Sequence, residues 1–199
     1  MSRRLVIGID PGADGAVAAL YMGRPMQILG AARLARWVPR PQATGDAAAM
    51  TAALRLHRDA VAMLRAVGVE AGDTASVIME APQLRPRQSG GAVQGVRAGA
   101  VGMAGAMAIY TITGRPPLQV EAVTAAEWTR AMGLQVSSLD AASPAAERAA
   151  RKRHRCQRVM ELAPGAGSML IQDGCRVAHD GVADAILIAL YGAGYGDGQ

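Results

Sequence analysis

The sequence contains no phenylalanine, a single lysine (Lys152) and only two cysteines in 199 residues. Cys156 and Cys175 form no CxxC pair, which indicates reduced thiols in a cytoplasmic protein. Nearly all of the positive charge is therefore arginine, and the net charge is +5. A basic balance can simply aid solubility, but it favours a polyanionic partner, nucleic acid in particular, because arginine suits bidentate contacts with phosphate.

Long hydrophobic runs are also absent. The apolar stretch after Arg3 and Arg4 is short and is interrupted by Asp10, so it is not a secretory signal peptide. The uncharged run between Arg97 and Arg115 consists mostly of Ala and Gly, and it is too short and too weakly apolar to span a membrane. With 51% hydrophobic and 19% charged residues, the chain is expected to fold, and its length suits one domain over residues 1–199.

Four acidic residues stand where an apolar segment ends or a helix face turns inward. Asp10 ends the run LVIGID, and Glu80 ends the run SVIME. Asp180 and Asp184 lie four residues apart in AHDGVADAILIALYG, so they share one face of a helix. If these positions meet, the like charges raise one another's pKa unless a cation lies between them. Oxygen ligands suit Mg²⁺ or Mn²⁺, so the pattern predicts a two-metal phosphoryl-transfer site.

The spacing of apolar residues and turn signals predicts an α/β fold. Strands are expected at residues 4–10, 16–22, 26–34, 75–80 and 116–123, and helices at about 47–67, 91–110, 124–132, 144–162 and 180–193. Three hairpin-linked strands followed by alternating strands and helices predict a mixed five-stranded sheet with helices on both faces. Residues 33–46 are expected to form a surface loop, and residues 194–199 a frayed tail.

Polar residues predict where several helices begin. Thr124 and Glu127 form a capping box for a short helix with Trp128 as its apolar anchor. Ser143 followed by proline is a cap with proline in the first turn, and Asp46 is expected to cap the first helix. The apolar side expected for that first helix comprises Ala53, Leu54, Ala60, Val61, Leu64 and Val67.

Small residues recur every four positions in the helix expected at 91–110. One row contains Gly91, Gly95 and Gly99, and a second contains Ala98, Gly102 and Ala106. Each glycine inside a helix costs about 1 kcal/mol relative to alanine, so such rows indicate the close approach of another backbone or a ligand. Two arrangements remain open, namely tight packing of the helix on its own sheet and contact with a helix of a second subunit.

Several motifs carry a resemblance to a known family. The segments IGIDPGADGAVA, IMEAP and HDGVADAILIALYG, in this order, resemble RuvC-type Holliday junction resolvases of the ribonuclease H-like superfamily. VTAAEWTRAMGL followed by ERAARKRHRCQRVMELAPGA is similar to the phage and bacterial RuvC-like branch, where a short Trp-containing helix precedes a basic helix. The resemblance covers about residues 3–193. It implies a ribonuclease H-like fold and a Mg-dependent crossover junction endodeoxyribonuclease that leaves 5′-phosphate and 3′-hydroxyl ends.

The resemblance assigns the four acids as catalytic metal ligands. It implies two Mg²⁺ ions per active site, for which Mn²⁺ can substitute. Asp10 matches the ligand shared by both ions, Glu80 the acid at the end of the fourth strand, and Asp184 the acid of the last helix. Family members place the penultimate acid three residues before the last, whereas here the acid is four before. Asp180 is therefore the expected fourth ligand, with His179 in reserve.

Basic residues close to these motifs are candidates for DNA binding. Arg148, Arg151, Lys152 and Arg155 share one face of the expected helix 144–162, where either a solvated face or phosphate contact fits. Further candidates flank the glycine-rich helix at Arg85, Arg87 and Arg97. Family members can wedge an aromatic side chain into the junction after the second acid, but the segment APQLRPRQ has none, which leaves Leu84 as an apolar wedge.

The expected activity is structure-selective cleavage of Holliday or other branched DNA. Selectivity for a junction needs two active sites at a fixed distance, so a homodimer is expected. The expected partners are therefore branched DNA and a second copy of the chain, which would make contact through residues 91–110. Two other classes stay open. One is a catalytically silent junction-binding protein, and the other is a nucleotide-binding domain of the actin or sugar-kinase type, which shares the strand–Asp–Gly opening.

Overall fold

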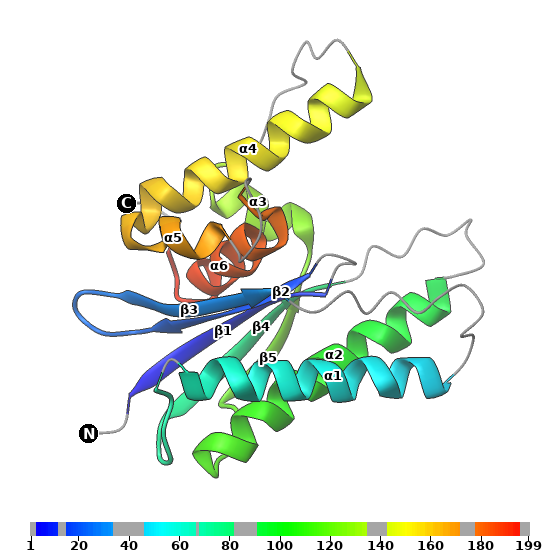
Figure 1. Cartoon of the computed structure of the whole chain (residues 1–199), viewed down its shortest axis with the longest axis vertical. Coiled ribbons are helices and arrows are strands. Elements are labelled where there is room, and N and C mark those ends of the chain that lie inside the picture. The colour runs from blue at the N-terminus through cyan, green and yellow to red at the C-terminus, as the bar shows by residue number, and fades with distance from the viewer. Residues whose placement is uncertain are drawn as a thin grey trace.

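Five strands form one mixed sheet in the order β3-β2-β1-β4-β5 (Figure 1). The strands are β1 (Arg4–Asp10), β2 (Ala16–Tyr21), β3 (Gln27–Arg33), β4 (Thr74–Glu80) and β5 (Gln119–Val123). The first three strands are antiparallel, and β4 and β5 run parallel to β1. This computed structural model describes residues 3–11, 15–33, 46–66, 68–81, 91–134, 143–171 and 178–195. Within them, the predicted α/β fold with a mixed five-stranded sheet is confirmed.

The central strand β1 is buried on both faces because helices cover the sheet on both sides. Leu5, Ile7 and Ile9 point into a core that includes residues of two long helices, α1 (Asp46–Ala66) and α2 (Gly91–Thr113). Val6 points to the other face, into a core shared with the remaining helices. An uninterrupted apolar run such as LVIGI is typical of a strand in this position, and its polar end is Asp10.

The second face carries the C-terminal helices. They are α3 (Ala125–Ala131), α4 (Pro144–Leu162), the short 3₁₀ helix η1 (Pro164–Ala166), α5 (Gly167–Leu170) and α6 (Asp180–Gly192). Figure 1 shows α6 directly on the sheet and α4 outermost on the same side. The capping box of Thr124 and Glu127 and the cap at Ser143 are both formed as predicted. In the part of the chain that the structure describes, no helix is long and apolar enough to cross a lipid bilayer.

Helix α6 approaches β1 closely because Gly8 has no side chain. A Cβ atom placed on Gly8 would lie 2.1 Å from the carbonyl oxygen of Ala185 and 2.5 Å from the amide nitrogen of Ala189. At the other end of α6, a Cβ on Gly192 would lie 2.2 Å from Cγ1 of Ile78. Two glycines thus bring this helix backbone against the sheet. This close contact fixes the position of the side chains of α6 relative to the ends of the strands.

Some small residues of the glycine-rich helix α2 face the sheet, and at least one is exposed on the other side of the helix. A Cβ on Gly105 would lie 2.6 Å from Cδ1 of Ile9, and one on Gly102 would lie 3.2 Å from Cε of Met79, so these residues face the sheet. Gly99 is exposed, and a Cβ there would meet no atom within 4 Å. Packing on the chain's own sheet therefore explains part of the pattern and leaves the side with Gly99 open.

Three details of the sequence interpretation were wrong. Leu54 was placed on the apolar side of α1 but is 63% exposed, because the described core contacts of α1 begin further along, at Ala60. Asp46 is the first residue of α1 rather than its cap. The two end residues of the expected loop 33–46 belong to other elements, Arg33 to β3 and Asp46 to α1, and residues 34–45 lie outside the described part.

The first two residues of the expected tail 194–199 are ordered at the end of α6. Gly194 has a φ of 76°, and its amide donates to the carbonyl of Tyr191 at 2.9 Å. The amide of Tyr195 donates to the carbonyl of Leu190 at 3.0 Å, which completes a Schellman motif at the end of α6. Residues 194 and 195 are thus part of the helix terminus, and residues 196–199 lie outside the described part.

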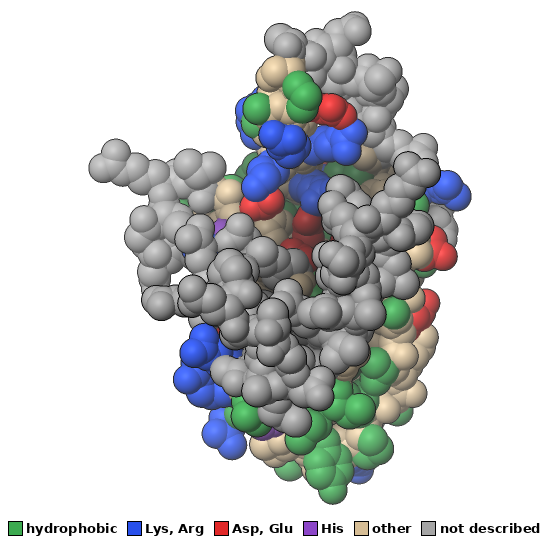
Figure 2. Space-filling view, turned by 90° about the vertical axis from the view of Figure 1, so that its right-hand side faces the viewer, with side chains coloured by type: hydrophobic (Ala, Val, Ile, Leu, Met, Phe, Trp, Pro, Cys, Tyr) green, Lys and Arg blue, Asp and Glu red, His purple; other side chains and the backbone are tan. Residues whose placement is uncertain are grey.

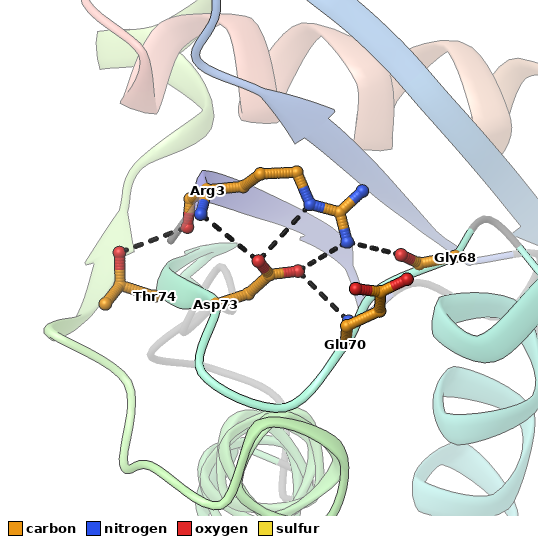
Figure 3. A network of polar contacts seen from close by, with 5 residues as sticks. All are labelled: Arg3, Gly68, Glu70, Asp73 and Thr74. Atoms are coloured by element: carbon orange, nitrogen blue, oxygen red, sulfur yellow. Dashed lines mark hydrogen bonds and ion pairs between the residues drawn. The ribbon is translucent and has the colours of Figure 1, made fainter. Parts of the chain in front are cut away.

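An ion pair ties the start of β1 to the turn before β4 (Figure 3). Asp73 is buried, and its Oδ2 accepts from Nη2 of Arg3 at 2.6 Å and from the amide of Glu70 at 3.0 Å. Its Oδ1 accepts from the amide and from Nε of Arg3, both at 3.2 Å. Burial alone raises the pKa of Asp73, but the hydrogen bonds from Arg3 and Glu70 outweigh it and leave the pKa below the ordinary 3.8.

We expect Asp73→Asn to lower the free energy of unfolding by about 2 kcal/mol at pH 7, because it removes the charge from this hydrogen-bonded pair. A depressed carboxyl pKa contributes stability that is fully present above the unfolded value and is lost as the pH falls through the folded value. The difference between Asp73→Asn and wild type in urea titrations should therefore shrink as the pH is lowered below the ordinary carboxyl pKa. The control Asp59→Asn removes an exposed pair with Arg58 and should cost under about 0.5 kcal/mol.

Gly8→Ala should destabilise the protein by about 3 kcal/mol or more, because its methyl group would overlap the backbone of α6. The measurement is urea unfolding followed by circular dichroism. Gly167→Ala is the matched control, since Gly167 has helical φ and ψ and its added methyl group would meet no atom within 4 Å. A Gly8→Ala protein as stable as the control would contradict the close contact between α6 and β1.

Candidate active site

Two of the four predicted acids lie side by side at one edge of the sheet. The parallel register of β1 and β4 pairs Ile9 with Met79, and the next residue of each strand is Asp10 and Glu80. Beyond Glu80, the amide of Ala81 donates to the carbonyl of Val123 on β5 at 2.7 Å, which holds the end of β4 in place. Because parallel strands end at the same edge, both carboxylates start from neighbouring backbone positions.

Helix α6 brings the other two acids to the same edge. Asp180 is the first residue of α6, and Asp184 stands one turn later, next to the Ala185 carbonyl that approaches Gly8. Asp184 is buried, and burial raises its pKa well above the ordinary value. The nearby charge of Arg155 opposes this shift, whereas the negative charges of Asp10, Glu80 and Asp180 add to it. The structure thus brings the four predicted acids into electrostatic contact.

Two cations of α4 lie among these carboxylates. Nη1 of Arg155 donates to Oδ2 of Asp184 at 2.5 Å, and Nζ of Lys152 lies 2.7 Å from Oδ2 of Asp180. Burial raises the pKa of Asp180, but the hydrogen bond and charge of Lys152 outweigh it and lower the pKa below its usual value. Figure 2 shows Lys and Arg side chains gathered above acidic side chains in a recess of the surface. The positive charges therefore offset part of the repulsion between the acids.

Glu80 has a different partner, the indole of Trp128. Nε1 of Trp128 donates to Oε2 of Glu80 at 2.9 Å, and Trp128 is fully buried in the core cluster that also contains residues of α6. Burial raises the pKa of Glu80, while the Trp128 hydrogen bond and the charge of Arg155 act in the opposite direction. The sequence interpretation assigned Trp128 only to packing. Its contact with Glu80 joins residues 48 positions apart, which no local pattern could reveal.

His179, the reserve ligand, forms the N-cap of α6. Its Nδ1 accepts from the amide of Val182 at 3.3 Å, and the side chain is buried. Asp180 follows the cap as the first residue of α6. With Nδ1 engaged by the helix, a ligand or proton-transfer role of His179 would have to use Nε2.

The donor set fits a hard divalent cation. All four acids offer only oxygen, as Mg²⁺ and Mn²⁺ prefer. Oδ1 of Asp184 is buried and has no hydrogen-bond partner among the residues that the structure describes, so one carboxylate oxygen is left unsatisfied close to the other acids. In the described part of the chain, no three His, Cys, Asp or Glu side chains stand in the arrangement of a finished metal site. Arg155, Lys152 and Trp128 instead hold one oxygen each of Asp184, Asp180 and Glu80.

The other predicted DNA-binding residues are spread over α4 and over segments outside the described part. Arg151 pairs with Glu147 on its own helix, and Arg148 is exposed. The backbone of Arg97 belongs to α2, but its side chain is outside the description. The remaining candidates on the segment after Glu80 also lie outside it, and they are Leu84, Arg85 and Arg87. Of the candidates whose side chains the structure describes, only Lys152 and Arg155 are paired with the acids.

Solved structures provide the comparison for this arrangement. The sequence matches no protein-family model and no curated protein. The chain is similar to the yeast mitochondrial Holliday junction resolvase Ydc2, with 15% identity and a TM-score of 0.51 over 96% of this chain and 76% of that one. Thermus thermophilus RuvC gives 20% identity and a TM-score of 0.48 over 94% of this chain and 91% of that one.

A second Thermus thermophilus structure, RuvC in complex with Holliday junction substrate, gives 19% identity and a TM-score of 0.48 over 94% of this chain and 90% of that one. The likeness to Ydc2 spans nearly the whole chain, which contains the five-stranded sheet. The family resemblance of the motifs is thereby confirmed at the level of the fold. The chain has the fold of the RuvC-type Holliday junction resolvases.

Proposed function

We propose that this protein is a divalent-cation-dependent endonuclease that cleaves Holliday or other branched DNA junctions. The observation that carries the proposal is the meeting of Asp10, Glu80, Asp180 and Asp184 beside two cations of α4. A purely structural role does not account for a buried Asp184 whose Oδ1 has no partner, because burying an unsatisfied carboxylate costs stability. The fold and the motif resemblance point to the same activity.

The four acids would hold two Mg²⁺ ions, with Mn²⁺ as a substitute. Bound there, the cations would supply an activated water for attack on the phosphate and stabilise the leaving 3′ oxygen, which gives 5′-phosphate and 3′-hydroxyl ends. Asp10 and Glu80 contribute carboxylates from rigid strand ends, whereas Asp180 and Asp184 contribute theirs from a helix pressed against β1. These backbone positions fix the spacing of the four side chains before any substrate arrives.

The basic face of α4 is the proposed contact for the DNA backbone. This face comprises Arg148, Arg151, Lys152 and Arg155, which recur along one side of the helix. Lys152 and Arg155 lie at the acids. Phosphate groups carry the negative charge that these side chains require, and such contacts position DNA without reading its sequence. Arg85, Arg87 and Arg97 remain candidates for the DNA arms, with the adjoining Leu84 as a candidate wedge.

Junction cleavage at two symmetric positions would require a homodimer, and the open side of α2 is its proposed interface. Gly99, Met103, Met107 and Tyr110 recur at helical spacing, and the last three are 64%, 55% and 60% exposed. A row of exposed apolar side chains next to a bare glycine is suited to contact with another helix. The row thus supports the second of the two arrangements that the glycine pattern left open.

Asp10→Asn should bind a synthetic four-way junction as wild type does but nick it at least about 1,000-fold more slowly, because several kcal/mol of cation-dependent stabilisation are lost. The measurement is cleavage of a labelled junction with Mg²⁺, beside an EDTA sample and a plain duplex. Glu70→Gln changes an exposed acid at the opposite edge of the sheet and should leave the rate unchanged. An active Asp10→Asn enzyme would disprove the role of the acids.

The wild-type result separates the alternatives. Paired nicks that need Mg²⁺ and are absent on duplex support the resolvase. Tight junction binding without cleavage would favour a silent binding protein, and tight ATP binding without junction preference would favour the nucleotide-binding class.

Gly99→Leu should give folded monomers, because leucine at this open position meets no atom of its own subunit but obstructs a neighbouring helix. Light scattering measures the mass, and circular dichroism verifies folding. Gly99→Ala is the conservative control and should remain dimeric, since a methyl group is small. A dimeric Gly99→Leu protein, or a monomeric wild type, would rule out this interface.

A further inference from the structure

Two side chains that are not acids connect two of the proposed metal ligands. The indole N–H of Trp128 donates to Oε2 of Glu80 at 2.9 Å. The guanidinium of Arg155 lies 5.4 Å from the centre of the Trp128 ring and donates to Oδ2 of Asp184 at 2.5 Å. A continuous series of side-chain contacts therefore joins Glu80 at the end of β4 to Asp184 on α6, by way of Trp128 on α3 and Arg155 on α4.

The indole is held rigidly enough to fix the carboxylate it contacts. Helix α3 is closed at its start by the Thr124–Glu127 capping box. At its end, Nε of Arg158 on α4 donates to the carbonyl of Met132 at 2.8 Å. With Trp128 fully buried between these two ends, the ring has one orientation, and Glu80 receives its hydrogen bond from one direction only. Oε2 of Glu80 is thus committed to the indole, which leaves Oε1 for other contacts.

Arg155 behaves as an internal counter-ion. It binds one oxygen of Asp184, while the other oxygen, Oδ1, is buried without a hydrogen-bond partner. A divalent cation among the acids would supply the positive charge that Arg155 now supplies, and the two charges would repel each other at this short distance. The side chain of Arg155 is 28% exposed, so it can turn outward when a cation arrives.

We propose that Trp128 and Arg155 are positioning residues of this site, with opposite effects on the divalent cation. Trp128 orients Glu80 and so favours cation binding, whereas Arg155 holds Asp184 in place until a cation displaces it. The inference rests on the proposed function in that the acids are taken as cation ligands. It adds that the cation must compete with a side chain of the protein itself.

The test is Mn²⁺ binding without DNA, measured from the electron paramagnetic resonance signal of free Mn²⁺ at pH 8. Trp128→Phe removes the donor to Glu80 but keeps a ring beneath Arg155, and it should weaken Mn²⁺ binding by about 10-fold. Arg155→Gln removes the competing charge and should tighten Mn²⁺ binding several-fold. Arg155→Lys keeps the charge and should restore an affinity close to that of wild type.

Opposite signs distinguish positioning from simple structural support, because damage to the fold would weaken binding in both variants. Arg153→Gln is the matched control, since it removes a positive charge from an exposed position of the same helix and should leave the affinity unchanged. Thermal melting verifies that each variant is folded. If Trp128→Phe does not fold, Arg155→Gln still tests the competition with the cation, because the side chain of Arg155 is partly exposed and can be replaced without loss of the fold.

Failure of this inference and failure of the proposed function give different results. If wild type cleaves junctions but Arg155→Gln binds Mn²⁺ no more tightly than wild type, the competition is disproved and the nuclease stands. If wild type does not cleave but the two variants shift Mn²⁺ affinity in opposite directions, the positioning pair stands and the nuclease falls. A wild-type protein that does not bind Mn²⁺ would overturn the inference.

Discussion

The repulsion between carboxylates at the end of β1 is the constraint on which the other features of the site depend. Asp184 is buried, and the charges of Asp10, Glu80 and Asp180 all make its ionised form less favourable. Such a group must be neutralised, paired or given a cation, because an isolated buried charge costs several kcal/mol. Arg155 supplies the pairing for Asp184 in the chain alone, and Lys152 does the same for Asp180. Helix α4 is thereby bound to the site by charge as well as by apolar packing.

The fold maintains this unfavourable arrangement by making the backbone around it rigid. Gly8 lets α6 lie directly on β1, so Asp184 cannot move away without separating a helix from the central strand. Trp128, fully buried, fills the space between the end of β4 and the layer of α4 and α6. Far from the acids, the pair of Arg3 and Asp73 anchors the opposite end of β1. Stability gained in the core and at that anchor offsets the electrostatic cost at the site, which is the usual relation between a scaffold and a reactive centre.

Local patterns were enough to predict the elements and the four acids, but not the partners of those acids. Asp10 and Glu80 could be found because each ends an apolar strand, and Asp180 and Asp184 because they are four apart on one helix. The contact of Arg155 with Asp184 joins residues 29 positions apart and depends on how α4 crosses α6. The sequence alone therefore predicted either a solvated face or phosphate contact for these basic residues, and not an ion pair with the acids. The exposure of Leu54 was missed for a similar reason, since helical periodicity does not say where a helix extends beyond the core.

The four-residue spacing of Asp180 and Asp184, where a three-residue spacing was expected from the resemblance, still lets both acids face the same site. Successive helix residues are about 100° apart, so positions three and four residues before Asp184 lie on either side of it, on the same helix face. Gly181 occupies the first of these positions and Asp180 the second, so the carboxylate moves around α6 by one residue. That move places Asp180 where Lys152 of α4 reaches it at 2.7 Å. The shift in the acid and the lysine that meets it are therefore best understood as a pair, in which Lys152, the only lysine in the chain, neutralises Asp180 from the basic face of α4.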